Sequence, residues 1–411
     1  MFIEPSRRKP AAHARQSGLS LVEIMVGVLI GMIGIIVIFQ MLATSEERKR
    51  TASAGSDVQV TGVIALTTLE RDIREAGYGF SSAAFDAGIT PVMGCTVNAF
   101  DSGRPVNAFT YRLTPIQIIQ GVGTASDTLI VLRGSGSTFP AAYVFTESTD
   151  TSKKTRGRAG ISPRDVLLVA RTTPTTDCLT VEITDVSDAD ALTIRHNQGS
   201  YNYTVYLPDG STSTEARIAR HNNATPPITF SSGYLFNLGN SPRRNIWTVQ
   251  NGRLQVTNDL LYQDSNGDGA NDPVEVADNV VSLQAEYGLN LNTVGANNGR
   301  VDTWRTADPG TLGTEPVSLW ANVLAVRVGI LVRSGQFERQ PDPLQPNEPN
   351  NHVTTVVPSW AGGQFAITNL DGTSSATKPA DPANHWKNYR YRVYETVIPL
   401  RNMLWGSQIR P

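Results

Sequence analysis

An apolar run over residues 19–43, with a single charge inside it, constrains this chain more than any other feature. The run is long enough to cross a bilayer, which takes about 20 apolar residues of helix. Its one charged residue is Glu23, and the next charge along the chain is Glu46. An acid within a membrane-length segment costs about 3 kcal/mol unless something compensates it. Glu23 is therefore a candidate functional residue.

The residues ahead of the run are basic. Arg7, Arg8, Lys9 and Arg15 stand against one acid, Glu4. Such a flank predicts that the N-terminus stays in the cytoplasm and that the remainder of the chain crosses the membrane. An ordinary secretory signal fits poorly, because its apolar core spans about 7–15 residues and ends at a small-residue cleavage site. We therefore expect a single-pass topology.

Residues 18–23, with the sequence Gly-Leu-Ser-Leu-Val-Glu, resemble the type III signal of type IV pilins and of type II secretion pseudopilins. In those proteins a membrane peptidase cuts after the glycine, and the new N-terminus is methylated. The resemblance implies that residues 1–18 are a leader that is removed, with Gly18 as its last residue. Leu19 then becomes the first mature residue and Glu23 the fifth, although the usual first residue in the family is phenylalanine.

Glu23 shares one helical stripe with three glycines, Gly27, Gly31 and Gly34, at spacings of four, four and three. Small residues on such a stripe let membrane helices approach closely. After cleavage, the amino group of Leu19 would be a cation that Glu23 of a neighbouring subunit can pair with. Breaking a buried pair of this kind costs about 3–5 kcal/mol. These four residues are predicted to act in assembly; the alternative is a plain anchor whose glutamate reaches the membrane interface.

The helix is predicted to continue to Ala76, because no proline interrupts residues 19–76. An apolar stripe in its second half has amphipathic spacing and consists of Gly62, Leu66, Leu69, Ile73 and Ala76. The opposite, polar face is predicted to hold Arg71, Asp72, Arg74 and Glu75, and Gly77 is placed to end the helix. Residues 19–43 would lie in the membrane or a filament core, and the second half would pack on a folded head. A short soluble helix after a flexible linker is the alternative.

Residues 77–411 have the composition of a β-rich extracytoplasmic head, organised as one elaborate domain or two lobes. Runs rich in β-branched or alternating apolar residues predict strands at 115–120, 128–133, 165–171, 179–185, 201–207, 245–249, 253–256, 280–287, 323–332 and 389–399. Asn251-Gly252 predicts a tight hairpin between two of them. The predicted fold class is α+β and pilin-like, with a long N-terminal helix packed on a mostly antiparallel head.

Three further segments look like the PilW group of minor pilins: Ile-Arg-Glu-Ala-Gly-Tyr-Gly at 73–79, Val-Ser-Leu-Gln-Ala-Glu-Tyr-Gly at 281–288, and Thr-Val-Ile-Pro-Leu-Arg-Asn at 396–402. The resemblance implies a low-abundance subunit that helps to start pilus assembly, sits at or near the pilus tip, and supports twitching motility and adhesion. Implied partners are other minor pilins, the major pilin, the prepilin peptidase and the inner-membrane assembly platform. The subunit would reside in the inner membrane before assembly and at the pilus tip afterwards. A type II secretion pseudopilin and a membrane-tethered binding protein or enzyme remain alternatives.

Residues 264–275 fit the spacing of a calcium-binding loop, D-x-[DN]-x-[DN]-G-x5-E. Its predicted ligands are Asp264, Asn266, Asp268, the carbonyl of Ala270, Asp272 and Glu275. Oxygen side chains at alternate positions suit a hard cation. The flanking segments read as strands instead of helices, and an Asn/Asp/Gly hairpin turn with solvated carboxylates is the alternative.

Cys95 and Cys178 are the only cysteines. The predicted topology places both outside the cytoplasm, where an even number of cysteines favours a disulfide. By the chain-entropy account, closing a loop of this length stabilises the fold by about 4–5 kcal/mol. Two separate buried thiols are the alternative.

Signals for catalysis are sparse. The five histidines are scattered without the spacing of metal ligands, and no phosphate-binding glycine loop occurs. We therefore expect a protein that is not an enzyme. The net charge is −2, and −5 without the leader, which gives no general footprint for nucleic acid, although Arg243 and Arg244 form a local basic pair.

Overall fold

The computed structural model describes residues 20–81, 92–136, 142–157, 160–171, 177–186, 192–223, 225–291, 299–306, 308–309, 320–338 and 352–408. The predicted cleavage residues Gly18 and Leu19 lie outside these ranges. The chain divides into two compact units, Met1–Ala54 and Gly55–Pro411.

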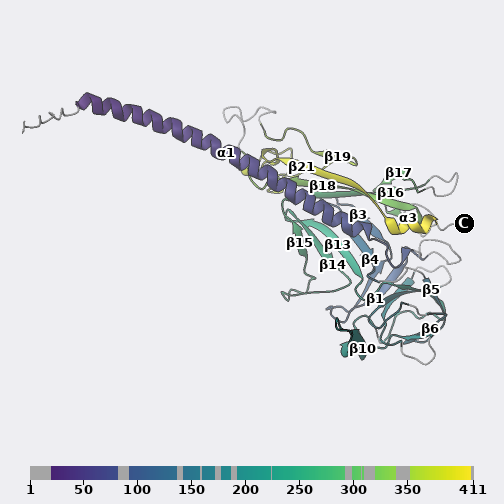
Figure 1. Cartoon of the computed structure of the whole chain (residues 1–411). Coiled ribbons are helices and arrows are strands. Elements are labelled where there is room, and N and C mark those ends of the chain that lie inside the picture. Colours follow the sequence, from purple (N-terminus) through teal and green to yellow (C-terminus); the bar gives the residue numbers. More distant parts are fainter. Residues whose placement is uncertain are drawn as a thin grey trace, which may run out of the picture. The chain divides into compact units, whose positions relative to one another are not determined.

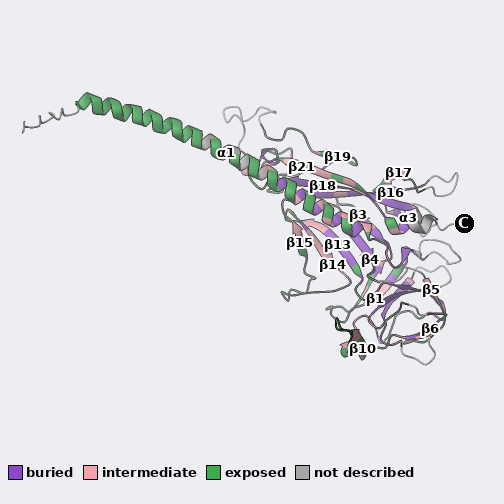
Figure 2. Cartoon of the chain, in the orientation of Figure 1, coloured by how far each residue is buried: buried purple, intermediate pink, exposed green. Residues whose placement is uncertain are grey.

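Helix α1 spans Leu21–Arg74, two residues inside each end of the predicted helix. In the first unit, every residue from Leu21 to Leu42 is exposed, as the uniform green of this part of α1 in Figure 2 shows. The segment Leu21–Leu42 has a mean hydropathy of 2.8 and is the one helix among the described residues that is long and apolar enough to cross a membrane. It is therefore compatible with membrane anchoring.

In the second unit, α1 buries one face. The buried side chains and glycine of this face are Val58, Gly62, Ala65, Leu69, Ile73 and Ala76, with Leu66 partly buried. The predicted apolar stripe is thus confirmed, and Val58 and Ala65 extend it. The placement of Asp72 on the polar face is wrong: its side chain is only 7% exposed. Position 72 follows Leu69 by three residues and precedes Ala76 by four, so it belongs to the buried stripe.

The helix ends at Arg74, and the turn that follows it contains a glycine with a left-handed backbone. Gly77 has φ +79°, and its N–H donates to the carbonyl of Leu132 at 2.9 Å. A glycine adopts this conformation without the strain that a Cβ would cause, as at many helix C-termini. The predicted terminator role of Gly77 is confirmed.

The described part of the second unit also contains twenty-one strands, most of them in three sheets (Figure 1). The eight-stranded sheet has the order β2 (Ala108–Arg112), β1 (Thr96–Phe100), β8 (Asp177–Glu182), β7 (Val166–Arg171), β12 (Gly233–Asn237), β5 (Ala142–Ser148), β6 (Ser152–Thr155), β9 (Thr193–Arg195). The five-stranded sheet has the order β15 (Val274–Ala277), β14 (Arg253–Asn258), β13 (Arg243–Gln250), β4 (Thr128–Arg133), β3 (Ile116–Ile119). The four-stranded sheet has the order β17 (Thr303–Arg305), β16 (Val280–Leu289), β18 (Val323–Arg333), β21 (Tyr391–Pro399).

Smaller elements complete the unit. Two separate hairpins are β10 (Ser200–Tyr206) with β11 (Thr212–Ile218), and β19 (Ser359–Trp360) with β20 (Gly363–Gln364). Three short 3-10 helices are η3 (Trp320–Asn322), η4 (Pro382–Asn384) and η5 (Trp386–Asn388), and a terminal helix α3 spans Arg401–Gln408. Among the described strands every pairing is antiparallel except β1 with β8. The α+β class and the mostly antiparallel sheets are therefore as predicted.

One apolar core joins the second half of α1 to all three larger sheets. It contains Leu69 and Ile73 of α1, Val97 of β1, Leu129 of β4 and Tyr287 of β16, all fully buried. A second cluster lies within the eight-stranded sheet, and a third lies between β18 and the segment that carries Phe365 and Trp386. The helix thus supplies part of the main core of this unit.

Each of the ten predicted strands corresponds to an observed strand, with ends that differ by at most a few residues. The hairpin at Asn251-Gly252 is also confirmed, because it joins β13 to β14 and both residues have positive φ, 51° and 74°.

Candidate assembly helix and its docking site

Glu23 lies in the first turn of α1 and is exposed. Its backbone N–H donates to the carbonyl of Ser20 at 2.9 Å. Within the described residues, its carboxylate forms neither a hydrogen bond nor an ion pair. An acid near a helix N-terminus is favoured by the helix dipole, typically by about 0.3–1 kcal/mol. That gain leaves both carboxylate oxygens available to a partner outside the described part of the chain.

The three glycines on the stripe of Glu23 have open space around them. A Cβ added at Gly27, Gly31 or Gly34 would meet no atom within 4 Å. None of the three has a positive φ that would require glycine. Neither packing nor backbone conformation within the described structure therefore explains why glycine occupies these positions.

In the second unit, Asp72 binds three side chains of the five-stranded sheet. Asn245 Nδ2 donates to both carboxylate oxygens at 2.9 Å, Trp247 Nε1 donates at 2.8 Å, and Arg133 Nε donates at 3.1 Å. Asn245 and Trp247 lie on β13 and Arg133 on the neighbouring β4. This buried carboxylate is fully hydrogen-bonded and also paired with a cation, so it fixes the helix on the sheet. Arg133 also pairs at 2.5 Å with Glu75, which directly follows the last residue of α1.

A close approach fixes the helix on β21. A Cβ at Gly62 would lie 2.0 Å from Cε2 of Tyr394, so any larger residue must displace that ring. The hydroxyl of Tyr394 donates to the carbonyl of Val58 at 3.1 Å. At the end of α1, Asn402 Nδ2 donates to the carbonyls of Glu75 and Ala76 at 3.3 and 2.9 Å. The contact with Ala76 satisfies a carbonyl group just beyond the end of the helix.

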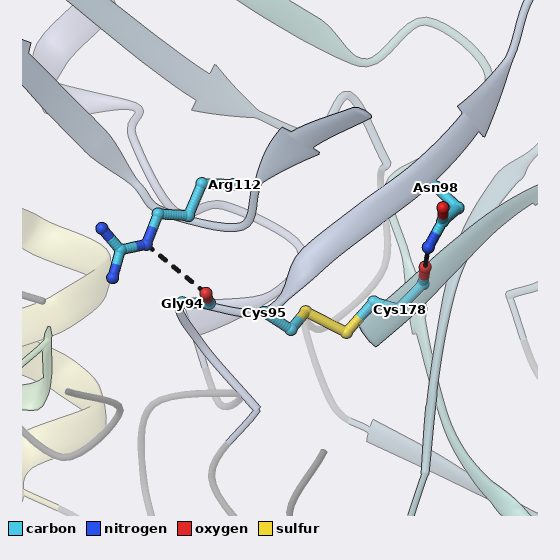
Figure 3. Close-up of a disulfide and its surroundings, with 5 residues drawn as sticks. All are labelled: Gly94, Cys95, Asn98, Arg112 and Cys178. Atoms are coloured by element: carbon cyan, nitrogen blue, oxygen red, sulfur yellow. Dashed lines mark hydrogen bonds between the residues drawn. A yellow bond between two sulfur atoms is a disulfide. The ribbon is translucent and has the colours of Figure 1, made fainter. Parts of the chain in front are cut away.

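Cys95 and Cys178 form a disulfide, as predicted (Figure 3). Cys95 directly precedes β1, and Cys178 lies in β8 opposite Val97. The bond therefore joins the two strands of the parallel pair, which share only three register positions. Asn98 adds a hydrogen bond to the carbonyl of Cys178 at 3.2 Å. A covalent link at this point stabilises a short pairing between segments far apart in the sequence.

The predicted calcium ligands lie in a loop between β14 and β15 that is closed by its own hydrogen bonds. Asp264 accepts backbone N–H groups of Gly269 at 2.9 Å, Gly267 at 2.6 Å and Asp268 at 3.2 Å. These bonds, that of Gly269 first, lower the pKa of Asp264. Asp272 accepts the N–H of Ser265 at 2.6 Å.

The last predicted ligand points to a different partner. Glu275 lies in β15 and pairs with Arg253 of β14 at 2.6 Å. Asn266 donates to Asp268 at 3.1 Å. Across the described residues, no group of three or more His, Cys, Asp or Glu side chains is arranged to hold a metal ion. Calcium binding by residues 264–275, including the carbonyl of Ala270, stays a prediction.

A cavity of about 410 Å³ beside the eight-stranded sheet contains a buried lysine and histidine. Lys153 Nζ donates to the carbonyl of Thr149 at 3.0 Å and to His196 Nε2 at 2.9 Å. Burial lowers the pKa of Lys153 to about 8, and burial together with the lysine charge lowers that of His196 to about 3. The imidazole is therefore neutral at pH 7 and serves as the acceptor. The pair is satisfied by hydrogen bonds, and no nucleophile takes part in it.

Sequence reasoning missed the role of Asp72, although its position within the buried stripe was a usable signal. It also missed the contact of Gly62 with Tyr394, which joins residues 332 positions apart. No local pattern reports such a pairing.

Comparison with known families gives one result. Residues 246–402 match the family model described as Type IV Pilus-assembly protein W. The matched region runs from β13 to the start of α3 and includes Trp247, Tyr394 and Asn402, three residues that contact α1. No curated protein and no solved structure matches the chain. The match agrees with the resemblance to the PilW group seen in the sequence and supports a relationship to PilW-type pilus proteins over residues 246–402.

Proposed function

We propose that this protein is a minor pilin that helps to start type IV pilus assembly and resides at or near the pilus tip. The PilW match over residues 246–402 supports a role in the pilus. The observation that carries the proposal is the state of residues 21–42, whose apolar side chains are all exposed and whose one carboxylate, Glu23, has no partner in the described structure. Such a surface requires a membrane or neighbouring helices to cover it.

In this proposal, prepilin peptidase removes the leader after Gly18, and the amino group of Leu19 is exposed. Glu23 then pairs with that amino group on an adjoining subunit, while Gly27, Gly31 and Gly34 allow the two helices to approach. The partners would be the major pilin, other minor pilins and the inner-membrane assembly platform. Before assembly the head would be periplasmic, and after assembly it would be displayed at the tip, where it supports twitching motility and adhesion.

We further propose a structural role without catalysis. The PilW match points to a pilus component. The buried Lys153–His196 pair is a closed hydrogen-bonded unit instead of a base that activates a nucleophile.

The test combines N-terminal mass spectrometry of the protein from its native envelope with pilus counts. We expect the wild-type protein to begin at Leu19. We expect Glu23→Ala to be cleaved normally but to be lost from sheared pili, because the amino group of the neighbour is left unpaired. Glu46→Ala is the matched control, since Glu46 is an exposed acid of the same helix whose ion pair with Lys49 is local.

Two results would overturn the proposal. One is a native protein that still begins at Met1. The other is a deletion strain that retains normal piliation and twitching. If such a strain has intact pili but loses protein secretion, the chain belongs to a type II secretion system instead.

A further inference from the structure

Two tryptophans flank a groove on one face of the four-stranded sheet. Trp304 of β17 lies over Gly288 of β16, where a Cβ would stand 2.8 Å from ring atom Cζ3. Trp360 of β19 lies over Gly329 of β18, where a Cβ would stand 2.7 Å from Cδ2. Neither glycine has a positive φ. Both therefore serve to make room for an indole ring directly on the sheet.

An arginine stands between the two rings. The guanidinium carbon of Arg327 lies 4.9 Å from the ring centroid of Trp304 and 5.7 Å from that of Trp360. Cation–π attraction at such distances holds aromatic rings in position. Glu286, the residue opposite Arg327 in the register of β16 with β18, forms an ion pair with it. The charge of Arg327 is thus compensated within the chain, and the guanidinium positions the rings without offering a free cation.

The groove between the rings has a volume of about 250 Å³, and its remaining wall is formed by β21. Glu395 of β21 is exposed, and one of its carboxylate oxygens accepts the N–H of Ala361 at 2.8 Å. Its other oxygen accepts no hydrogen bond from any residue that the structure describes. Val397, two residues on, is 55% exposed. The groove is therefore lined by two partly exposed indole rings, an exposed aliphatic side chain and an acceptor that is open to a ligand.

We propose that this groove binds a neutral saccharide. The apolar C–H face of a sugar ring stacks on an aromatic face, and its hydroxyl groups donate to a carboxylate. Glu395 is the uncompensated charge of the groove, so a saccharide that carries its own carboxylate is repelled. The volume of the groove lies just below the range of about 300–1,000 Å³ that is typical of small-molecule sites. A groove of this size suits an extended ligand that keeps one face in solvent. This binding activity goes beyond pilus assembly and does not depend on it.

The test uses the full chain in zwitterionic micelles, because detergents with sugar headgroups would compete. Lactose, maltotriose, cellotriose and tri-N-acetylchitotriose are titrated while tryptophan fluorescence and heat are measured. At least one of these saccharides is expected to bind, and Trp304→Ala is expected to weaken that binding about tenfold through loss of stacking. Glu395→Gln is expected to weaken it less, and sialyllactose is expected to bind more weakly than lactose.

The matched control is Tyr206→Ala, which removes an aromatic side chain that is 80% exposed in the β10–β11 region and should leave binding unchanged. If Trp304→Ala lowers the melting temperature strongly, Trp304→Phe and Glu395→Gln replace it as the test variants. Failure of all four neutral saccharides to bind the wild-type protein at millimolar concentration overturns the proposal. Binding that Trp304→Ala and Glu395→Gln both leave unchanged overturns it as well. Loss of piliation in Trp304→Ala, without saccharide binding by the wild type, assigns the groove to a protein partner instead.

Discussion

Helix α1 carries two acids in opposite situations. Asp72, in the second unit, accepts four hydrogen bonds from Arg133, Asn245 and Trp247 and is 7% exposed. Glu23, in the first unit, is exposed and has no partner within the described residues. Both interrupt an otherwise apolar stripe of the helix. Asp72 has its hydrogen-bond partners in the same chain and fixes the helix on the sheet. The carboxylate of Glu23 has no such partners in the described structure, so a cation of a neighbouring subunit could pair with it.

The glycines of α1 repeat this contrast. Gly62 is required by the ring of Tyr394, which would be 2.0 Å from a Cβ. A Cβ added at Gly27, Gly31 or Gly34 would meet no atom within 4 Å outside the neighbouring helix backbone. Glycine weakens a helix by about 1 kcal/mol relative to alanine, so three of them in a short segment need a compensating interaction. The second half of the helix thus makes its contacts within the chain, while the described structure gives Glu23 no partner and gives the three glycines of the first half no packing reason.

The strongest test of this contrast is Asp72→Ala. The change removes the acceptor of Arg133 Nε and of the buried donors of Asn245 and Trp247, so we expect the free energy of unfolding to fall by about 3–5 kcal/mol. Denaturant titration of the full chain in micelles, followed by circular dichroism, measures this loss. Asp57→Ala, at an exposed acid of the same helix, should change stability by less than about 0.5 kcal/mol. A loss below about 1 kcal/mol for Asp72→Ala would show that the buried network contributes little.

A paired glycine experiment sharpens the comparison. Gly62→Ala must push Tyr394 aside and should destabilise the second unit by about 1–2 kcal/mol, even though alanine is the better helix former. Gly27→Ala has open space and should leave the melting temperature unchanged or slightly raised. If Gly27 packs against another subunit, Gly27→Ala should lower the number of pili more than Gly62→Ala does. The reason is that a methyl group at position 27 separates the two helices. Equal effects of the two changes on both measurements would remove the distinction between the two halves.

Much of the fold could be predicted because its signals are local. The helix follows from apolar spacing without proline, and strands such as β4 and β18 follow from runs of Val, Ile and Leu. Two of the strands that were not predicted, β11 and β12, lack such patterns. β11, with the sequence Thr-Ser-Thr-Glu-Ala-Arg-Ile, is mostly polar and pairs only with β10 among the described strands. β12 spans only five residues and begins with glycine, and burial on both faces removes any alternation.

The candidate sites also differ in whether a local sequence signal predicts them. The disulfide followed from two cysteines and the predicted compartment, which need no knowledge of the sheet. Asp72 was misplaced because an acid was assumed to face solvent, although its spacing from Leu69 and Ala76 placed it in the buried stripe. The Trp304–Trp360 groove was not predictable, because it depends on which glycines of β16 and β18 lie beneath the rings. Register across a sheet is set by long-range pairing.

The smallest effect that we expect is that of a substitution beside the loop at residues 264–275 on its affinity for calcium. If it binds calcium, Glu275 has to leave Arg253, whose guanidinium lies 2.6 Å away. An exposed pair of this kind contributes about 0–1 kcal/mol, so Arg253→Ala should raise the apparent calcium affinity by no more than about fivefold. Calcium titration monitored by melting temperature measures the change, because a ligand at ten times its Kd stabilises the native state by about 1.4 kcal/mol. Arg390→Ala, which breaks a surface pair with Glu338 outside the loop, is the matched control. If millimolar calcium shifts the melting temperature of neither the wild type nor Arg253→Ala, the loop is a turn held by its own hydrogen bonds, such as those of Asp264 and Asp272.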